Sequence, residues 1–284
     1  MQRYSIKEKQ LTVRLREFFK DKRLNEITID RIHEFRQWRA SSACKNSTIN
    51  GEVGFLRRLL KKARLWHRMG DDIKPLKEGS TIGRALSEEE IICLRAKAAE
   101  RPPWQVAYDA MIIAVNTGMR GADIKALRWR DVDFFNRVLF VPKSKTAAGE
   151  RSIPLTDEVL KTLLNIQERA KLFGEVLPNH YIFPAHKTGA RFNGNAIVEW
   201  QHFAFDPTKP MTTWRTAWRN LTKEAGLKGL RFHDLRHHVI TKLIESGAPD
   251  GVIMSIVGHV DRRMLDRYSH VRLDAKRAAL NGLF

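Results

Sequence analysis

The stretch that sets this chain apart from an all-helical protein reads VDFFNRVLFV over residues 132–141, followed by RSIPL over residues 151–155. Branched and aromatic side chains favour extended backbone, and the polar pair Asn136-Arg137 between two apolar halves is typical of a tight turn. The first stretch therefore predicts a β-hairpin, and the second predicts a third short strand. Residues 145–150, which lie between them, predict a flexible turn.

Helical patterns lie on both sides of this small sheet. Residues 108–116 are almost continuously apolar, which predicts a buried helix that Thr117-Gly118 ends or bends. Residues 174–212 are rich in Pro, Gly and Asn, and we expect them to be irregular. The whole pattern predicts an α+β fold, mostly helical, with a small antiparallel sheet. Further helices are expected from 123, after 156, at 213–225 and at 233–246.

The first third of the chain predicts helices alone. Apolar residues recur every three or four positions from Ile49 to Ala63 and form one stripe, with Ser47 as the expected N-cap. Another helix is expected at 28–38. Basic side chains lie mostly off the stripe, which gives its helix a cationic outer face suited to a DNA backbone. These DNA-binding candidates are Arg57, Arg58, Lys61, Lys62 and Arg64.

The helical pattern is interrupted between Gly70 and Gly83. This polar segment contains Pro and Gly, and we interpret it as a linker between two domains. Ser87 then caps a new helix, with Glu90 at the capping-box position. We therefore expect one domain over residues 1–80 and a second over residues 83–284.

The composition indicates a folded protein with a polyanionic partner. Of the 284 residues, 51 are Lys or Arg and 32 are Asp or Glu, so the formal charge is +19, and residues 1–82 carry +10 of it. Neutralising phosphates releases counterions, which makes nucleic acid the leading partner. A hydrophobic content of 43% excludes a disordered basic tail. Two distant cysteines, Cys44 and Cys93, exclude a disulfide framework and a four-cysteine zinc site, and no apolar run is long enough to span a membrane.

Four short segments carry side chains suited to chemistry on a phosphodiester. Arg120 and Asp123 are three residues apart after a helix break, so that both can lie on one face. Lys145 lies on the turn between two predicted strands. The segments are TGMRGAD (117–123), PKSKT (142–146), HDLRH (233–237) and GH (258–259), the last followed nine residues later by Tyr268.

Attack on a phosphodiester spreads negative charge over the equatorial oxygens. Two arginine forks can bind those oxygens bidentately, and imidazole N–H groups add donors. A lysine on a mobile turn can protonate the leaving oxygen, and a tyrosine can form a covalent ester with phosphorus. Because a phenol has a pKa of about 10, cations and a base beside it must help to deprotonate it. Each segment alone is a weak signal, but their combination in this order indicates covalent cleavage of a phosphodiester.

In order and spacing, the segments from Arg120 to Tyr268 resemble the catalytic motifs of the tyrosine recombinases, the phage integrase family of site-specific integrases. The resemblance implies an all-α, SAM-like core-binding domain over 1–80 and a tyrosine recombinase catalytic domain over 83–284. It also implies that DNA strands are cleaved and rejoined through a 3′-phosphotyrosyl intermediate, without metal, ATP or another cofactor. We expect the family's first helix, which would precede the region matching residues 10–21, to be absent.

The resemblance assigns roles to the matched residues. Tyr268 is the expected nucleophile, which forms the 3′-phosphotyrosyl bond and frees a 5′-hydroxyl. Arg120 and Arg236 are expected to clamp the scissile phosphate, and Lys145 to protonate the leaving oxygen. Lys143 stays a rival acid, because alternate residues of an extended segment lie on the same side.

The other matched residues would support this reaction. His233 would assist as base and donor, and His259 would hydrogen-bond the phosphate. Asp123 matches the family's acidic position beside the site and would orient Arg120 or His233. The resemblance also implies duplex DNA as the substrate, a homo-tetramer on paired DNA sites, accessory DNA-bending proteins and no membrane partner. The expected location is the cytoplasm of a prokaryotic cell, at the nucleoid.

Several alternatives stay open at this point. A type IB topoisomerase uses a similar residue set to relax DNA, and a decayed mobile-element protein would only bind DNA. His233 and His237 have the spacing of a helical zinc pair, but Arg236 would lie beside the ion. The tail 278–284 either packs on its own domain or docks on a neighbouring protomer. A generic basic RNA-binding protein comes last, because nothing in it requires the ordered segments.

Overall fold

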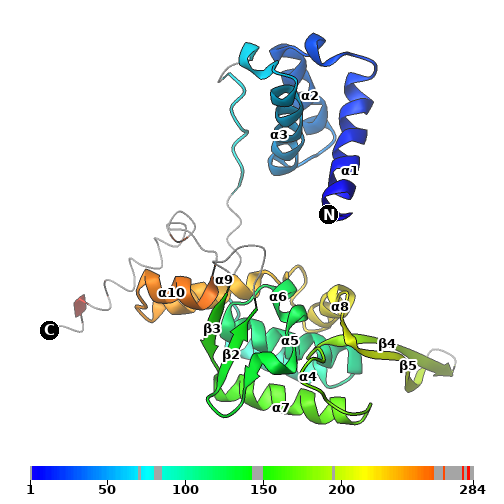
Figure 1. Ribbon diagram of the computed structural model, residues 1–284, viewed down its shortest axis with the longest axis vertical. Helices are drawn as coiled ribbons and strands as arrows, with labels where there is room; N and C mark the ends of the chain where they lie inside the picture. The colour runs from blue at the N-terminus through cyan, green and yellow to red at the C-terminus, as the bar shows by residue number, and fades with distance from the viewer. Residues whose placement is uncertain are drawn as a thin grey trace. The chain divides into compact units, whose positions relative to one another are not determined.

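The computed structural model describes residues 2–69, 72–79, 85–142, 150–193 and 196–258, together with residues 265, 277, 280 and 281. The chain divides into two compact units, Met1–Thr81 and Ile82–Phe284, and each has a hydrophobic core of its own (Figure 1). None of the described helices is long and apolar enough to cross a membrane. The predicted fold class, mostly helical with small antiparallel sheets, is confirmed.

The first unit is helical, as expected. Its helices pack against one another through apolar side chains such as those of Phe35 and Leu60, which are both fully buried. Each such side chain stabilises the fold by about 1.5–3 kcal/mol relative to leaving it in water. The elements are α1 (Gln2–Phe19), α2 (Ile29–Ser41), α3 (Asn46–Lys62) and 3-10 turns at Leu24–Glu26 and Trp66–Arg68.

The helix α3 carries the predicted apolar stripe, with a correction at each end. The helix begins at Asn46 after Lys45, whose backbone is extended, so the prediction of Ser47 as N-cap was wrong. Ala63 is exposed, because the helix ends at Lys62 and the stripe ends with it. The stripe residues that are buried against α1 and α2 are Ile49, Val53, Leu56 and Leu60.

The described part of the predicted linker, residues 72–79, is anchored to the first unit. Residues 72–79 have no regular secondary structure, as expected, but Ile73 is buried in the core. The side-chain amide of Asn50 pairs with the backbone of Leu76, accepting its N–H at 2.8 Å and donating to its carbonyl at 2.9 Å. The Arg36 guanidinium donates to the carbonyl of Lys74 at 2.8 Å. This segment therefore belongs structurally to the first unit.

A buried helix, α5 (Pro102–Thr117), forms the centre of the second unit. The helix before it, α4 (Glu88–Ala98), begins with the predicted capping box, in which Ser87 accepts from the Glu90 N–H at 3.3 Å and Glu90 from the Ser87 N–H at 3.0 Å. The other described helices of the unit are α6 (Gly121–Ala126), α7 (Asp157–Lys171), α8 (Arg215–Glu224), α9 (Asp234–Glu245) and α10 (Asp250–Val257), with a 3-10 turn at Trp129–Asp131.

The predicted hairpin and third strand are confirmed as an antiparallel sheet of order β1-β2-β3. Leu139 pairs with Ile153 at its centre, and both side chains are buried against the helices. Burial alternates along β2 and β3, so the other face of these strands is partly solvated. The strands are β1 (Val132–Asp133), β2 (Val138–Val141) and β3 (Arg151–Pro154).

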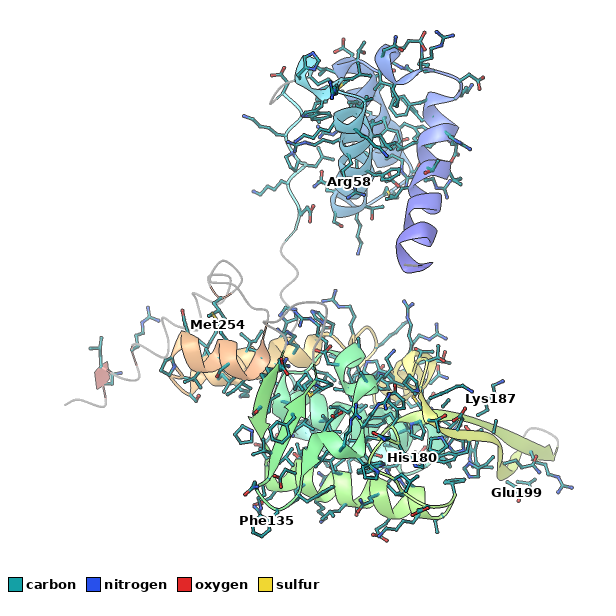
Figure 2. All side chains as sticks on the ribbon, viewed as in Figure 1. Arg58, Phe135, His180, Lys187, Glu199 and Met254 are labelled. Atoms are coloured by element: carbon teal, nitrogen blue, oxygen red, sulfur yellow. The ribbon has the colours of Figure 1, made fainter. Side chains whose placement is uncertain are left out.

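The prediction that residues 174–212 are irregular was wrong, because β4 (Pro184–Asn193) and β5 (Ala196–Pro210) form a long antiparallel hairpin. Figure 1 shows this hairpin reaching outward from the helices of its unit, and Lys187 and Glu199 lie along it (Figure 2). Its strands mix apolar and polar residues without regular alternation, as in AIVEWQHFAF over residues 196–205, and their register shifts at three places. The hairpin therefore lacks the regular apolar alternation by which strands are predicted.

Candidate active site

The first predicted site segment begins where α5 ends against α10. Gly118 adopts a left-handed backbone, with φ of 64°, and caps the C-terminus of α5. A Cβ atom on Gly118 would lie 2.2 Å from Cγ1 of Val257, which is closer than any side chain allows. Glycine is thus required here both by conformation and by the close approach of the two helix ends.

The guanidinium of Arg236, on α9, holds these two helix ends together. Its side chain is fully buried, and its Nη1 donates to the carbonyls of Gly118 at 2.7 Å and Val257 at 2.6 Å. Its Nη2 donates to the carbonyl of Gly258. Carbonyls at helix C-termini lack helical partners and carry partial negative charge, so a buried cation is stabilised there. Arg236 therefore fixes the backbone on both sides of the candidate site.

Arg120 lies two residues beyond Gly118, at the N-cap of α6, and is half-buried. A Cβ on the next residue, Gly121, would lie 3.3 Å from ring atoms of both Phe232 and Trp214. The turn that carries Arg120 therefore packs against Phe232, which immediately precedes His233. Tertiary packing thus brings together two segments that are more than 100 positions apart in the sequence.

His233 precedes α9 and lies in the electric field of both predicted arginines. The residue as a whole is exposed, yet partial burial of the ring, followed by the charges of Arg236 and Arg120, lowers the pKa of His233 below its ordinary value of 6.5. The neutral ring therefore predominates at pH 7 and can accept a proton. An ion pair between Arg231 and Asp234, at 2.6 Å, holds the start of this helix.

The neighbouring ring of His237 meets that of His233 edge to face, with centroids 5.5 Å apart. In the described part of the chain, no group of three or more His, Cys, Asp or Glu side chains could hold a metal ion. His238 points elsewhere, and its Nδ1 accepts a hydrogen bond from the backbone of Leu86 at 3.0 Å. This bond ties α9 to the segment that leads into α4.

Arg151, the first residue of β3, is a member of the site that the sequence analysis missed. Its Nε donates to the carbonyl of Ile256 at 2.7 Å, and a Cβ on Gly258 would lie 2.9 Å from its Nη1. Gly258 has φ of 61°, a conformation that favours glycine. Strand alternation could have indicated it, because residues two apart in a strand lie on the same side, and Arg151 therefore shares a side with the buried Ile153.

Asp123 and Arg120 both act electrostatically on Arg151. Burial lowers the pKa of Arg151, the carboxylate of Asp123 opposes that shift, and the charge of Arg120 adds to it. The role predicted for Asp123, to orient Arg120 or His233, stays a prediction. The structure adds Arg151 as a group that Asp123 stabilises.

Four predicted residues, Lys143, Lys145, His259 and Tyr268, lie outside the described residues. Their flanking segments are described. β2 ends at Val141 and β3 begins at Arg151. Gly258 closes α10, and Leu265 is fully buried in a small core shared with α9 and α10. The roles assigned to the four side chains stay predictions.

The basic face predicted in the first unit is exposed on α3 and just beyond its end, and Arg58 is labelled in Figure 2. Two of its members rest on aromatic rings. The Arg57 guanidinium lies 5.2 Å from the centroid of Trp66, and that of Arg58 lies 5.4 Å from the centroid of Phe55. Among the described residues, no carboxylate forms an ion pair with any member of this face. The full set is Arg57, Arg58, Lys61, Lys62 and Arg64.

The chain is similar in sequence to known recombinases and integrases. The Shufflon-specific DNA recombinase of Escherichia coli is 31% identical over 178 residues, which cover 60% of this chain and 38% of that protein. The integrase of Salmonella phage P22 is 27% identical over 161 residues, covering 56% of this chain and 37% of the relative. The chain therefore spans less than half the length of either relative.

Solved structures show the same fold. The integrase of transposon Tn1549, solved with transposon right end DNA, superposes with a TM-score of 0.74 at 20% identity, covering 97% of this chain and 91% of that one. A lambda integrase dimer bound to a COC′ core site gives 0.66 at 20% identity, covering 92% and 89%. Residues 84–274, more than half of the chain, match the Phage integrase family. The chain is a member of the phage integrase family.

Proposed function

We propose that this protein is a site-specific DNA recombinase, an integrase that cleaves and rejoins DNA strands through a 3′-phosphotyrosyl intermediate. The observation that carries the proposal is that Arg236 binds the carbonyls of Gly118 and Val257 while the charges of Arg236 and Arg120 both act on the ring of His233. The recombinase and integrase names of the relatives support the same activity.

In the proposed reaction, the phenolic oxygen of Tyr268 attacks the scissile phosphorus. The bond from phosphorus to the 5′-oxygen breaks, and Lys145 donates a proton to that oxygen. The neutral ring of His233 takes the phenol's proton, which its lowered pKa allows. The charges of Arg120 and Arg236 stabilise the phosphoryl oxygens in the transition state. Attack by the 5′-hydroxyl of another strand reverses the sequence and joins the new ends.

The remaining groups would position these reactants. His259 donates a hydrogen bond to a phosphate oxygen, and Asp123 orients the cationic side of the site. Arg236 also keeps the ends of α5 and α10 in register, because three carbonyls receive its hydrogen bonds. The reaction conserves bond energy in the phosphotyrosine, so no ATP is needed.

The proposed substrate is duplex DNA, contacted in the first unit by the basic face of α3. We assign residues 1–80 to DNA binding and 83–284 to catalysis. A homo-tetramer on paired sites is the proposed assembly, supported by a solved lambda integrase tetramer on a Holliday junction. Accessory DNA-bending proteins and a prokaryotic, nucleoid-associated location complete the proposal.

Covalent capture tests the function directly. Protein isolated under denaturing conditions, without cross-linker and with excess chelator, should carry attached DNA from cells that hold the source genome. Sequencing should place the adducts at a few repeated positions. Scattered adducts would favour relaxation by a topoisomerase, and adducts lost with chelator would require a metal. A protein that gives no adduct, even on a nicked substrate that blocks rejoining, would be a DNA-binding remnant.

Arg151 offers a test of how the site is positioned. We expect Arg151→Ala to lower the single-turnover cleavage rate by about 10- to 100-fold, because one charge-assisted hydrogen bond is worth about 1.5–3 kcal/mol. DNA affinity should stay within about threefold, and Arg151→Lys should recover part of the rate. The matched control is Arg137→Ala, since Arg137 pairs with Asp157 at the exposed edge of the same sheet. Equal rates in both alanine variants would contradict the assignment.

A further inference from the structure

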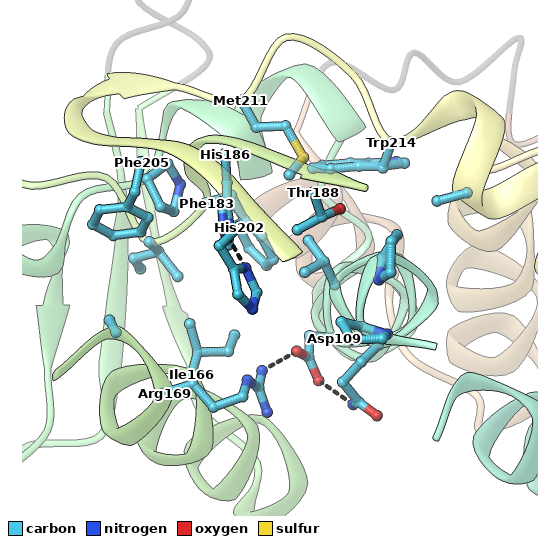
Figure 3. Close-up of a pocket in the computed structure, with 18 of the residues that line it drawn as sticks. Asp109, Ile166, Arg169, Phe183, His186, Thr188, His202, Phe205, Met211 and Trp214 are labelled. Carbon is cyan, nitrogen blue, oxygen red and sulfur yellow. Dashed lines mark hydrogen bonds and ion pairs between the residues drawn. The ribbon is translucent and has the colours of Figure 1, made fainter. Parts of the chain in front are cut away.

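The second unit contains a cavity of about 460 Å³ that the proposed reaction does not use. It lies between α5, α7, the base of the β4–β5 hairpin and the start of α8 (Figure 3). Its volume falls within the usual range of small-molecule sites, about 300–1,000 Å³. Arg120, Asp123, His233 and Arg236 are absent from its lining. The cavity is therefore separate from the residues assigned to the proposed reaction.

One side of the cavity carries a buried carboxylate. Asp109, on α5, is 4% exposed and accepts a hydrogen bond from Gln105 at 2.9 Å and one from the guanidinium of Arg169 (Figure 3). Burial raises the pKa of Asp109 to about 6, although Arg169 opposes the shift. A carboxylate can accept about four hydrogen bonds, so about two acceptor positions are left by these partners.

The opposite side is a wall of flat rings from α7's end and the hairpin. Phe173 stacks on Phe205 with centroids 4.8 Å apart, and it meets His186 and His202 edge to face at 5.0 Å. The two imidazoles stack at 4.8 Å and share a hydrogen bond of 2.8 Å. Figure 3 shows the rings of His186, His202 and Phe205 across the cavity from Asp109 and Arg169. Flat faces of this kind select a planar occupant.

The charges around the cavity select a neutral occupant. Asp109 and Arg169 compensate each other, and burial together with His202 lowers the pKa of His186, which keeps that ring uncharged at pH 7. Arg101, whose guanidinium lies 4.5 Å from the centroid of Trp104, is exposed, so water screens its charge. No unpaired carboxylate is present among the lining residues to attract a cation.

We propose that this cavity binds a neutral, planar bicyclic molecule that carries a cyclic amide edge, an N–H group beside a carbonyl. The N–H donates to the carboxylate of Asp109, and the carbonyl accepts from Arg169. The ring system lies against the wall formed by Phe205 and His202. A bicyclic ring system can lie against both of these rings and fits within a space of about 460 Å³. Binding of this kind is a property of the second unit alone.

The test uses the full chain with ¹³C-labelled methionine methyl groups and isoquinolin-1(2H)-one as the probe. Met211 lines the cavity, whereas Met69 is buried in the first unit and Met254 is exposed on α10. We expect a saturable shift of the Met211 methyl signal, assigned with Met211→Leu, with a Kd of about 1 mM or tighter. The signals of Met69 and Met254 should not move.

Matched probes separate the chemical features. The N-methylated probe, which lacks the donor, should bind at least about tenfold more weakly, because it leaves Asp109 without the added hydrogen bond. 2-Naphthoate, an anion, and 1-aminoisoquinoline, which is largely cationic at pH 7, should also bind more weakly. Equal affinity of the N-methyl probe, or tighter binding of either charged probe, would overturn the proposed ligand class.

Two variants place the binding in the cavity. Ala170→Trp fills the space from α7, and Asp109→Asn exchanges an acceptor oxygen for an amide at nearly constant volume. Both should abolish the Met211 shift or weaken it at least about tenfold. Ala126→Trp, on the exposed end of α6, is the control and should bind as the unmodified chain does. If Ala170→Trp unfolds, Asp109→Asn decides. A Met211 signal that never shifts, or one that shifts equally in Asp109→Asn, overturns the proposal.

Discussion

Replacing Tyr268 by Phe should abolish covalent attachment of the protein to DNA. The substitution removes one hydroxyl oxygen and leaves the ring, so the variant keeps its volume but has no atom that can bond to phosphorus. Loss of a covalent nucleophile lowers turnover on the order of 10⁴-fold or more, because the remaining groups cannot form the intermediate. Adduct formation, followed by denaturing electrophoresis with a nicked duplex, measures the effect.

DNA affinity should survive this substitution. The substitution leaves the cationic groups proposed to contact phosphates unchanged, so the Kd of Tyr268→Phe for duplex DNA should stay within about threefold of the unmodified value. Tyr181→Phe is the matched control, since the Tyr181 hydroxyl bonds to Arg128 at 2.9 Å within the second unit and is far from the segment 258–268 in sequence. Adducts that persist in Tyr268→Phe would assign the nucleophile to another side chain.

The small sheet and the central helix could be predicted because their patterns are local. Branched and aromatic residues flank the polar pair Asn136-Arg137 in the hairpin, and residues 108–116 are almost continuously apolar. The Ser87–Glu90 capping box is likewise a contact within one helical turn. Patterns of this kind are carried by a few consecutive residues, so they survive without knowledge of the tertiary structure.

The features that were missed depend on contacts between distant segments. The β4–β5 hairpin is held by ladder hydrogen bonds and by ring contacts such as Phe173 with Phe205, and its own strands lack regular apolar alternation. Residues 72–79 read as a linker because they lack a helical or strand pattern, yet Asn50 and Arg36 anchor them. No local signal marks either arrangement.

The candidate site shows the same division. Residue type and order indicated Arg120, His233 and Arg236, because the chemistry of a phosphodiester needs those groups. The sequence did not indicate that the Arg236 guanidinium binds three backbone carbonyls, since these belong to Gly118, Val257 and Gly258 in two other segments. This structural role of Arg236, which is to hold the backbone of the site, can be recognised only from the fold.

Arg236→Ala should therefore damage both the reaction and the stability of the second unit. Removing the guanidinium leaves three buried carbonyls without this donor, and each lost partner costs about 1–3 kcal/mol. A net loss of about 3 kcal/mol lowers the unfolding midpoint by about 6–12 °C in a unit of this size. Cleavage should slow by about 10³-fold or more, because the phosphate also loses a fixed positive charge. Thermal unfolding and single-turnover cleavage measure the two losses.

Arg120→Ala separates the contribution of an arginine to the reaction from its contribution to stability. Arg120 is half-buried at the start of α6, so its removal should reduce stability by less than Arg236→Ala does, while the cleavage rate falls comparably. Arg236→Lys keeps the charge but has no fork to reach three carbonyls, and it should recover little of either property. An unchanged unfolding midpoint in Arg236→Ala would contradict the carbonyl contacts. If either alanine variant slowed cleavage by less than about tenfold, or about 1.4 kcal/mol, a role at the phosphate would be contradicted. A fixed charge at the reacting oxygens stabilises the transition state by more than this amount.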